Sequence, residues 1–223
     1  MRGGVLLFRG PGVEARRFID AAHARDTGHC HADSGSAAAY AELDHSGAIT
    51  AERALTAEAY EAWADWINPI TGEPMGRPRR ASAGRAGSVR FADMSVNVPY
   101  DWSILAATDR GFAAALDAAQ LDAADQIRRW VAQHALTRVG PQHAQEQLSV
   151  ERLQVVVIAQ DRNRLGAPYR HMHVQIGGRV WAVGKWRALD TAALLFEQQW
   201  RIRRLGTAVI EAHRLQPPSG PGC

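Results

Sequence analysis

The pattern of apolar and polar positions predicts five short strands. Each is a run of apolar or alternating residues that is bounded by Gly, Pro or polar turn residues. They span residues 5–8, 91–98, 153–159, 169–176 and 179–183. The run at 153–159 (LQVVVIA) is rich in β-branched residues, which is typical of a buried strand. Gly177-Gly178 predicts a hairpin turn between the last two strands.

Helical periodicity predicts four amphipathic helices. They span residues 13–25, 51–66, 111–135 and 192–214. In the second of these, Leu55, Ala59 and Trp63 recur every four residues and would form one apolar face. Strands in adjacent hairpins, with helices packed on one face of them, indicate an α+β fold with an antiparallel central sheet.

These elements form one expected domain over residues 1–214, followed by a disordered tail at 215–223. Two polar stretches interrupt the domain. Residues 27–39 are small and histidine-rich and are expected to form a mobile loop. Residues 76–90 (GRPRRASAGRAGSVR) have no apolar periodicity and are expected to form a flexible basic loop.

The charge balance is mildly basic and rests almost wholly on arginine. The net charge is +3, and Lys185 is the single lysine among 26 basic residues. Guanidinium groups bind phosphate oxygens in a planar fork and stack on bases, so this balance is compatible with nucleic acid. The predicted DNA contacts are Arg77, Arg79, Arg80, Arg85 and Arg90. The alternative is a solvated loop without a ligand.

Cysteine use and hydropathy indicate a cytoplasmic protein. Cys30 and Cys223 lie far apart in the sequence, and two free thiols in a reducing compartment are expected. The apolar run near the N-terminus is too short for a secretion signal. No segment approaches the roughly 18 apolar residues that a membrane-spanning helix requires.

The triplet His171-Met172-His173 is the most informative chemical feature. On a strand, alternate side chains share a face, so both imidazoles would project together, about 6–7 Å apart along the chain. An antiparallel neighbour ending at Gln160 would bring an amide oxygen beside them. Two nitrogen ligands, one oxygen ligand and open positions suit Mg²⁺ or Mn²⁺ better than Zn²⁺. The alternative is a pair of solvated histidines.

Several motifs in the same order resemble the TrwC/TraI-type (MobF) conjugative relaxases, which are HUH endonucleases. Residues 168–173 (PYRHMH) resemble the family's histidine strand, and residues 186–190 (WRALD) resemble the segment that opens a later helix. Upstream, residues 71–77 (TGEPMGR) and residues 93–99 (DMSVNVP) resemble two further segments. The resemblance extends from about residue 13 to about residue 214 and implies the relaxase/Rep-like fold.

The resemblance implies site residues and also marks departures. The family's first metal histidine falls at Gln160, and its active-site aspartate falls at Asp93, which would orient a catalytic partner or ligand. The family's nucleophilic tyrosines fall in the first helix and the loop after it, where this chain has none. Three replacement nucleophiles are open: His29, His31 and Tyr40. Each could equally be an ordinary loop or half-buried residue.

The resulting expectation is a metal-dependent, site-specific enzyme that nicks and joins single-stranded DNA in conjugative transfer or plasmid mobilisation. Its partners would be single-stranded or hairpin DNA at a transfer origin, other transfer proteins or a separate helicase, and no membrane. Two alternatives remain. One is a catalytically degenerate protein that binds DNA without cutting it. The other is a metal-dependent hydrolase of small phosphoesters.

Overall fold

A computed structural model describes residues 5–20, 38–141, 143–163 and 165–215. Its centre is an eight-stranded antiparallel sheet, in which β1-β4-β8-β7-β2-β3 is the main order and β9 and β10 extend from β7. The strands are β1 (Val5–Phe8), β2 (Ala38–Asp44), β3 (Ile49–Leu55), β4 (Phe91–Asn97), β7 (Arg152–Arg162), β8 (Pro168–Gly177), β9 (Arg179–Ala182) and β10 (Lys185–Ala188). A separate hairpin pairs β5 (Leu136–Val139) with β6 (Glu146–Ser149).

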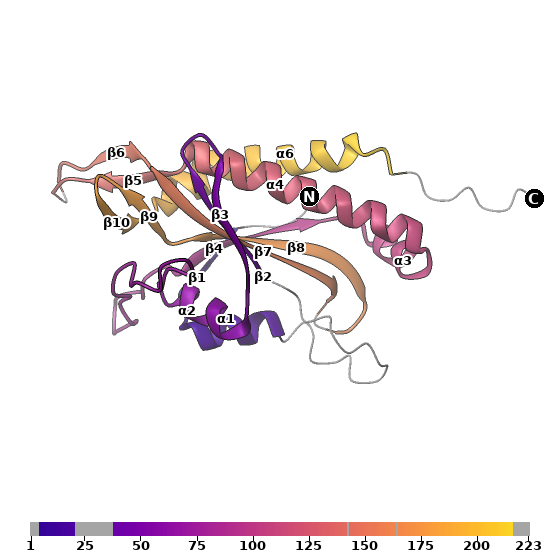
Figure 1. The fold of residues 1–223 in the computed structure, drawn as a ribbon, viewed down its shortest axis with the longest axis horizontal. Coiled ribbons are helices and arrows are strands. Elements are labelled where there is room, and N and C mark those ends of the chain that lie inside the picture. The colour runs from indigo at the N-terminus through magenta and orange to yellow at the C-terminus, as the bar shows by residue number, and fades with distance from the viewer. Residues whose placement is uncertain (1–4, 21–37, 142, 164, 216–223) are drawn as a thin grey trace, which may run out of the picture.

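Helices cover both faces of the sheet (Figure 1). On one side lie the long helix α4 and the C-terminal α6, with α3 at one end. On the other side lie α1 and α2. Their bounds are α1 (Gly12–Asp20), α2 (Ala57–Ala64), α3 (Tyr100–Thr108), α4 (Arg110–His134), α5 (Thr191–Ala193), the π-helix η1 (Leu194–Gln198) and α6 (Gln199–Ala212). The expected α+β class with an antiparallel central sheet is confirmed, although its helices occupy two faces rather than one.

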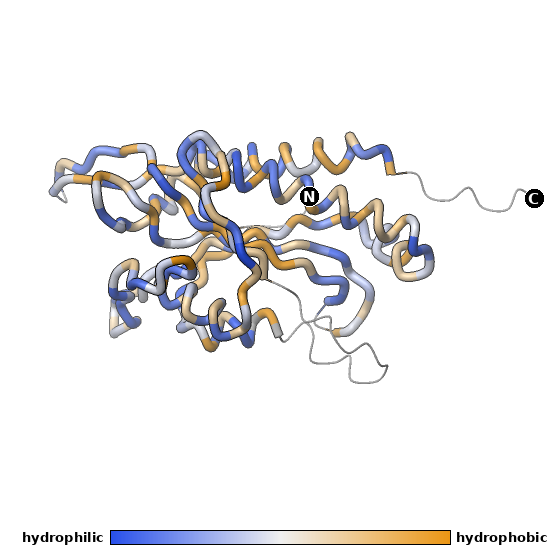
Figure 2. The backbone as a smooth tube through the Cα atoms, viewed as in Figure 1, coloured by the Kyte–Doolittle hydropathy of each residue, from blue (hydrophilic) through white to orange (hydrophobic). Residues whose placement is uncertain are grey.

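The period of two along the strands divides the core into two layers. Met94, Val96 and Met172 face α4 and share an apolar cluster with the buried residues of that helix. Val156 and Ile158 face the opposite way and pack with Tyr60 and Trp63 of α2. Figure 2 shows hydrophobic positions concentrated in the strands between the helix layers. Each layer therefore has its own apolar cluster. Polar side chains on the α1–α2 face lie next to the buried residues of the second cluster.

The prediction of a helix over residues 51–66 is wrong in its first half. Residues 49–55 form β3, which pairs with β2 as a hairpin, and only Ala57–Ala64 are helical. Thr56 is the N-cap, and its side chain accepts a hydrogen bond from the backbone N–H of Ala59. Ala38 and Ala39, which were expected to belong to the loop at 27–39, are part of β2. The rest of that range lies outside the described residues.

The hairpin expected at Gly177-Gly178 is also wrong, because β9 pairs with β10 and β7 rather than with β8. A Cβ atom on Gly178 would lie 2.1 Å from the carbonyl oxygen of Val89. The glycine therefore allows two backbone segments to approach closely, which is a role distinct from turn formation. Strands β2, β5, β6 and β10 and helix α3 were not predicted. No helix in the described ranges is long and apolar enough to cross a membrane.

Candidate metal centre and DNA-binding surface

The two histidines of β8 project from the face of the sheet that α1 and α2 partly cover. His171 and His173 are buried, and their ring centroids lie 5.0 Å apart. Met172 between them packs into the opposite core layer against α4. The alternation of a strand therefore places both imidazoles side by side, as the triplet predicts.

Gln160 lies directly opposite His171, because the two residues are register partners in the antiparallel β7–β8 pair. Register partners in such a pair point to the same face, so the amide and the imidazole are neighbours. The Gln160 Nε2 atom donates a hydrogen bond of 3.3 Å to the carbonyl oxygen of Ile19, near the end of α1. Because the amide nitrogen is used in this way, Oε1 is the atom that could act as a ligand.

Hydrogen bonds at Nδ1 fix the orientation of both rings. In His173, Nδ1 lies 2.8 Å from Oδ2 and 3.1 Å from Oδ1 of Asp93, which is on β4. In His171, Nδ1 lies 2.8 Å from the carbonyl oxygen of Tyr169. Each bond positions Nδ1 as the protonated nitrogen, so Nε2 is the nitrogen through which each ring would bind a metal.

The protonation state of His171 also suits metal binding. Burial lowers the pKa of His171, and the nearby His173 adds to this effect, while the bond to the Tyr169 carbonyl acts in the opposite direction. A lowered pKa keeps the imidazole neutral, and only a neutral ring nitrogen can act as a ligand.

The residues at this face fit a divalent ion. No group of three His, Cys, Asp or Glu side chains in the described ranges is arranged to hold a metal. A site at His171 and His173 therefore depends on a third ligand of another type, and the Gln160 amide is the neighbour that can supply it. Two imidazoles, one amide oxygen and a carboxylate that orients one of the rings are typical of a centre with open coordination positions.

The sequence analysis did not identify two buried glutamines that bind α2 to the sheet next to the histidines. The hydroxyl of Tyr60 donates a hydrogen bond of 2.8 Å to Oε1 of Gln175, which is the register partner of Asp93. The indole of Trp63 donates a bond of 3.2 Å to Oε1 of Gln154. Polar residues at positions 154 and 175, each between two apolar neighbours in its strand, were the available signal. They indicate that the α1–α2 face of the sheet is partly polar.

Two further polar side chains support β8 from the α3–α4 side. Ser103 accepts a hydrogen bond of 3.0 Å from the backbone N–H of Arg170. Gln120, on α4, donates to the carbonyl oxygens of Val96 (3.1 Å) and Arg170 (3.4 Å). These bonds tie the start of the histidine strand to its neighbour β4 and to the helix layer behind it.

Of the three nucleophile candidates, the described part of the chain contains only Tyr40. Tyr40 lies inside β2, not in a loop, and is 1% exposed. Burial raises its pKa, the nearby Glu42 adds to the shift, and Arg152 opposes it. A buried hydroxyl with a raised pKa is poorly suited to attack a phosphate. His29 and His31 lie outside the described residues.

The arginine segment divides into an exposed part and a buried part. Arg77, Arg79, Arg80 and Arg85 are exposed. Backbone bonds between Ser82 and Arg85, and between Ser88 and Arg79, give the segment a narrow hairpin-like form.

Unlike these exposed arginines, Arg90 is buried. This observation corrects the prediction that Arg90 contacts DNA. It is 7% exposed and lies 3.0 Å from Asp65, with its guanidinium 5.6 Å from the ring centre of Trp66. Burial lowers its pKa, although Asp65 acts to raise it. Arg90 therefore packs within the protein and has little surface to offer a phosphate.

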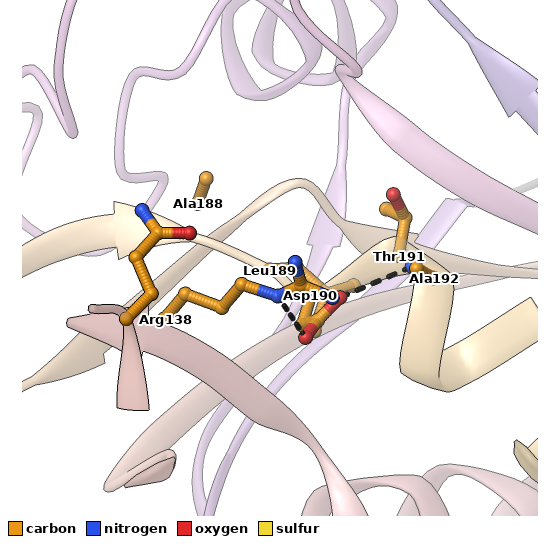
Figure 3. A pocket seen from close by; sticks show the side chains of 7 residues that line it. Arg138, Ala188, Leu189, Asp190, Thr191 and Ala192 are labelled. Carbon is orange, nitrogen blue, oxygen red and sulfur yellow. Dashed lines mark hydrogen bonds and ion pairs between the residues drawn. The ribbon is translucent and has the colours of Figure 1, made fainter. Parts of the chain in front are cut away.

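A cavity of about 390 Å³ lies elsewhere, between β5 and the turn that precedes α5 (Figure 3). Its acidic residue, Asp190, is 2.7 Å from Arg138, which also lines the cavity, and 2.9 Å from Gln147. Asp190 also accepts bonds from the backbone at Ala192 and Ala193. Burial acts to raise its pKa, but the bonds with Arg138 and Gln147 outweigh burial and lower it. This carboxylate is a helix cap with its bonds satisfied, so the cavity offers no second reactive group.

A central antiparallel sheet with a His-x-His strand at its middle, and helices on both faces, defines the relaxase/Rep-like class of HUH-endonuclease folds. A model of the TrwC relaxase family matches residues 28–215. The chain therefore belongs to the TrwC relaxase family. A search of curated proteins found no match.

Solved structures agree with this fold. A copper-bound structure of the conjugative relaxase TrwC in complex with oriT DNA has a TM-score of 0.70 and 15% identity, and the match covers 96% of this chain and 70% of that one. A metal-bound structure of the same complex gives 0.69 and 16%, over 96% and 69%. TrwC complexed with a 27-mer DNA comprising the recognition hairpin and the cleavage site gives 0.67 and 15%, over 96% and 68%.

Proposed function

We propose that this protein is a relaxase that cuts and rejoins one strand of DNA with the help of a divalent metal, in conjugative transfer or mobilisation of a plasmid or integrative element. The observation that carries this proposal is the convergence of His171, His173 and Gln160 on one sheet face, with Asp93 holding His173. The family of the chain makes a DNA relaxase the expected class of activity.

The proposed reaction transfers the scissile phosphate from the 3′ oxygen of the DNA to a protein side chain. A protein nucleophile attacks the scissile phosphorus and loses its proton, the bond from phosphorus to the 3′ oxygen breaks, and that oxygen takes up a proton and leaves as a 3′-OH. The DNA 5′-phosphate remains covalently bound to the protein. In the reverse step the 3′-OH attacks this phosphorus, displaces the protein side chain and restores the strand. No oxidant, reductant or nucleotide is consumed.

The residues of the chain have separate parts in this scheme. His171, His173 and Gln160 would hold the ion through Nε2, Nε2 and Oε1. A bound divalent ion would withdraw electron density from the scissile phosphate and offset the negative charge that develops on its oxygens. Asp93 keeps the His173 ring in one orientation, and the Tyr169 carbonyl does the same for His171. Burial of this face limits access of water to the phosphate.

The DNA partner is proposed to be a single-stranded or hairpin segment at a transfer origin. The TrwC structures that share this fold contain oriT DNA, and one contains a recognition hairpin with a cleavage site. The exposed Arg77, Arg79, Arg80 and Arg85 supply the positive charge that phosphate contacts require. Contacts of this type position the backbone without reading its sequence.

A second candidate is a protein that binds such DNA without cutting it. The observation that favours it is the burial of Tyr40, because this removes the tyrosine nearest to the family's nucleophile region from contact with DNA. In this case the histidine face would still hold an ion and a phosphate. The nucleophile is therefore the residue that separates the two candidates, and the relaxase proposal assigns it to His29 or His31.

The experiment is the capture of a covalent adduct. The protein is incubated with Mn²⁺ and single-stranded oligonucleotides that tile the transfer origin, and adducts are resolved on denaturing gels. A histidine phosphoramidate is lost on mild acid treatment, whereas a tyrosyl phosphodiester survives it. An acid-labile adduct that disappears in His29→Ala or His31→Ala supports the proposal. An acid-stable adduct lost only in Tyr40→Phe transfers the role to Tyr40. Binding without any adduct, with metal bound, supports the binding-only candidate.

A further inference from the structure

Helix α6 and the π-helix before it expose two large aromatic side chains. Phe196 is 82% exposed and Trp200 is 53% exposed, while Ile202 and Ile210 of the same helix are buried against the core. Phe196 and Trp200 are four residues apart, and their exposure places both on the solvent side of η1 and α6. Exposed aromatics of this size that lie close together are characteristic of contact surfaces.

Charged residues of both signs surround these aromatics. Glu197, Arg201 and Arg204 are exposed, and none of them forms an ion pair within the described ranges. The guanidinium groups of Arg201 and Arg204 lie 5.2 Å and 5.8 Å from the ring centre of Trp200. The stacking restricts both arginine side chains, so less conformational entropy is lost when they bind an acidic group. We call Phe196, Glu197, Trp200, Arg201 and Arg204 the α6 face.

The order of charges along the α6 face is self-complementary. Around a twofold axis between Trp200 and Arg201, two antiparallel copies of the helix would place Glu197 of each opposite Arg204 of the other. Trp200 of one copy would meet Arg201 of the other, and the Phe196 side chains would flank the contact. A twofold contact forms each pair of residues twice, so Glu197 and Arg204 of both copies are paired.

We propose that the α6 face binds a second copy of this chain and forms a back-to-back dimer. The face lies on η1 and α6, and α6 is on the α4 side of the sheet (Figure 1). His171 and Gln160 belong to the opposite face of the sheet, because Met172 beside His171 packs towards α4 and Gln160 is the register partner of His171. Pairing through α6 therefore leaves both histidine faces open to DNA. The contact involves about three helical turns, so the dimer is weak and reversible, as small interfaces are. The inference does not depend on the proposed function, because it concerns a different surface.

The test measures molecular mass by analytical ultracentrifugation across a range of protein concentrations, without DNA or metal. The wild-type mass should rise with concentration towards that of two chains. Phe196→Ala with Trp200→Ala should leave a monomer. Leu165→Ala, at an apolar residue that is 79% exposed on the β7–β8 turn, is the matched control and should dimerise like wild type. Circular dichroism verifies that each variant is folded.

A charge exchange makes the test specific to the proposed register. Arg204→Glu should weaken dimerisation by about ten-fold or more, because each Glu197 would then face a carboxylate, and two repulsions replace two attractions. Adding Glu197→Arg should restore it. A wild-type monomer at every concentration, or an exchange that does not restore pairing, would overturn the proposal. So would an aromatic variant that keeps its dimer but loses affinity for single-stranded DNA, because the α6 face would then be a DNA surface.

Discussion

Nδ1 of His173 lies 2.8 Å from Oδ2 of Asp93, across the β4–β8 pair. The bond joins a side chain that would bind a metal to a carboxylate on the neighbouring strand. In metal centres, such a partner fixes the ring and raises its basicity, and its loss typically reduces affinity by roughly 10–100-fold.

Asp93→Asn should therefore weaken Mn²⁺ binding by roughly 10-fold or more without removing it. The amide keeps the size of the side chain but lacks the negative charge. Isothermal titration calorimetry measures the affinity, and Asp101→Asn, at an exposed residue on α3, is the matched control. Equal affinity in Asp93→Asn and wild type would show that the carboxylate does not tune the ligand.

The combination His171→Ala with His173→Ala should abolish Mn²⁺ binding and leave the fold in place. Gln160→Ala should cause a smaller loss, because a neutral amide oxygen is a weaker ligand than imidazole. Calorimetry again provides the affinity, and His213→Ala, whose ring pairs with Asp122 on the α4–α6 side, is the control. Unchanged affinity in the double variant would exclude this site.

The exposed arginines at 79, 80 and 85 should contribute to the salt dependence of DNA binding. Replacing all three with Gln should reduce the slope of log affinity against log salt concentration by about two units, at roughly 0.7 per phosphate contact on a single strand. Fluorescence anisotropy at several salt concentrations measures this slope. Replacing the exposed Arg110, Lys185 and Arg214 with Gln removes the same charge outside this segment and outside the α6 face, and should leave the slope nearly unchanged. Similar slopes for the two triple variants would show that charge alone, and not position, matters.

Two tyrosine substitutions should differ in their effect on stability. Tyr60→Phe removes a buried hydrogen bond and leaves the Gln175 oxygen unpaired, which should cost about 1–3 kcal/mol. Tyr40→Phe removes a buried hydroxyl that has no hydrogen-bond partner among the described residues, so its cost should be near zero. Urea denaturation measures both free energies of unfolding. A large loss in Tyr40→Phe would mean that the hydroxyl is bonded after all.

Gly178→Ala should destabilise the protein by more than about 2 kcal/mol, because the added methyl group overpacks the site. It would lie 2.1 Å from the carbonyl oxygen of Val89 and 2.8 Å from that of Arg90, and neither backbone can move easily. Gly111→Ala, inside α4 with only a 3.3 Å contact, is the matched control and should be neutral or stabilising by about 0.5–1 kcal/mol. Equal effects of the two substitutions in urea denaturation would contradict this packing.

The centre of the fold was predictable because its signals are local. The period of two places His171 and His173 on one face whatever surrounds them, and an antiparallel β7–β8 pair brings Gln160 opposite His171. The failure at residues 51–66 has a different cause. In β3, Ile49 and Thr50 favour a strand, whereas Ala51, Glu52 and Leu55 favour a helix, so pairing with β2 decides the outcome.

Other features depend on contacts that no local pattern contains. Arg90 looks like its exposed neighbours in the sequence, yet it is buried because Trp66 and Asp65 lie beside it. The bonds of Tyr60 and Trp63 to the two strand glutamines depend on how α2 packs on the sheet. The close approach at Gly178 likewise requires the position of Val89.

As a proposed ligand, Gln160 would give the histidine face an oxygen whose charge does not change with acidity. A carboxamide neither gains nor loses a proton over the range in which imidazoles titrate, so only two of the three proposed ligands compete with protons for the ion. Acidification would then reduce the metal affinity at most in proportion to the square of the proton concentration. In a centre with three histidine ligands, the affinity could fall in proportion to the cube of that concentration. The amide would thereby make occupancy of the proposed centre less sensitive to acidification than a third histidine would.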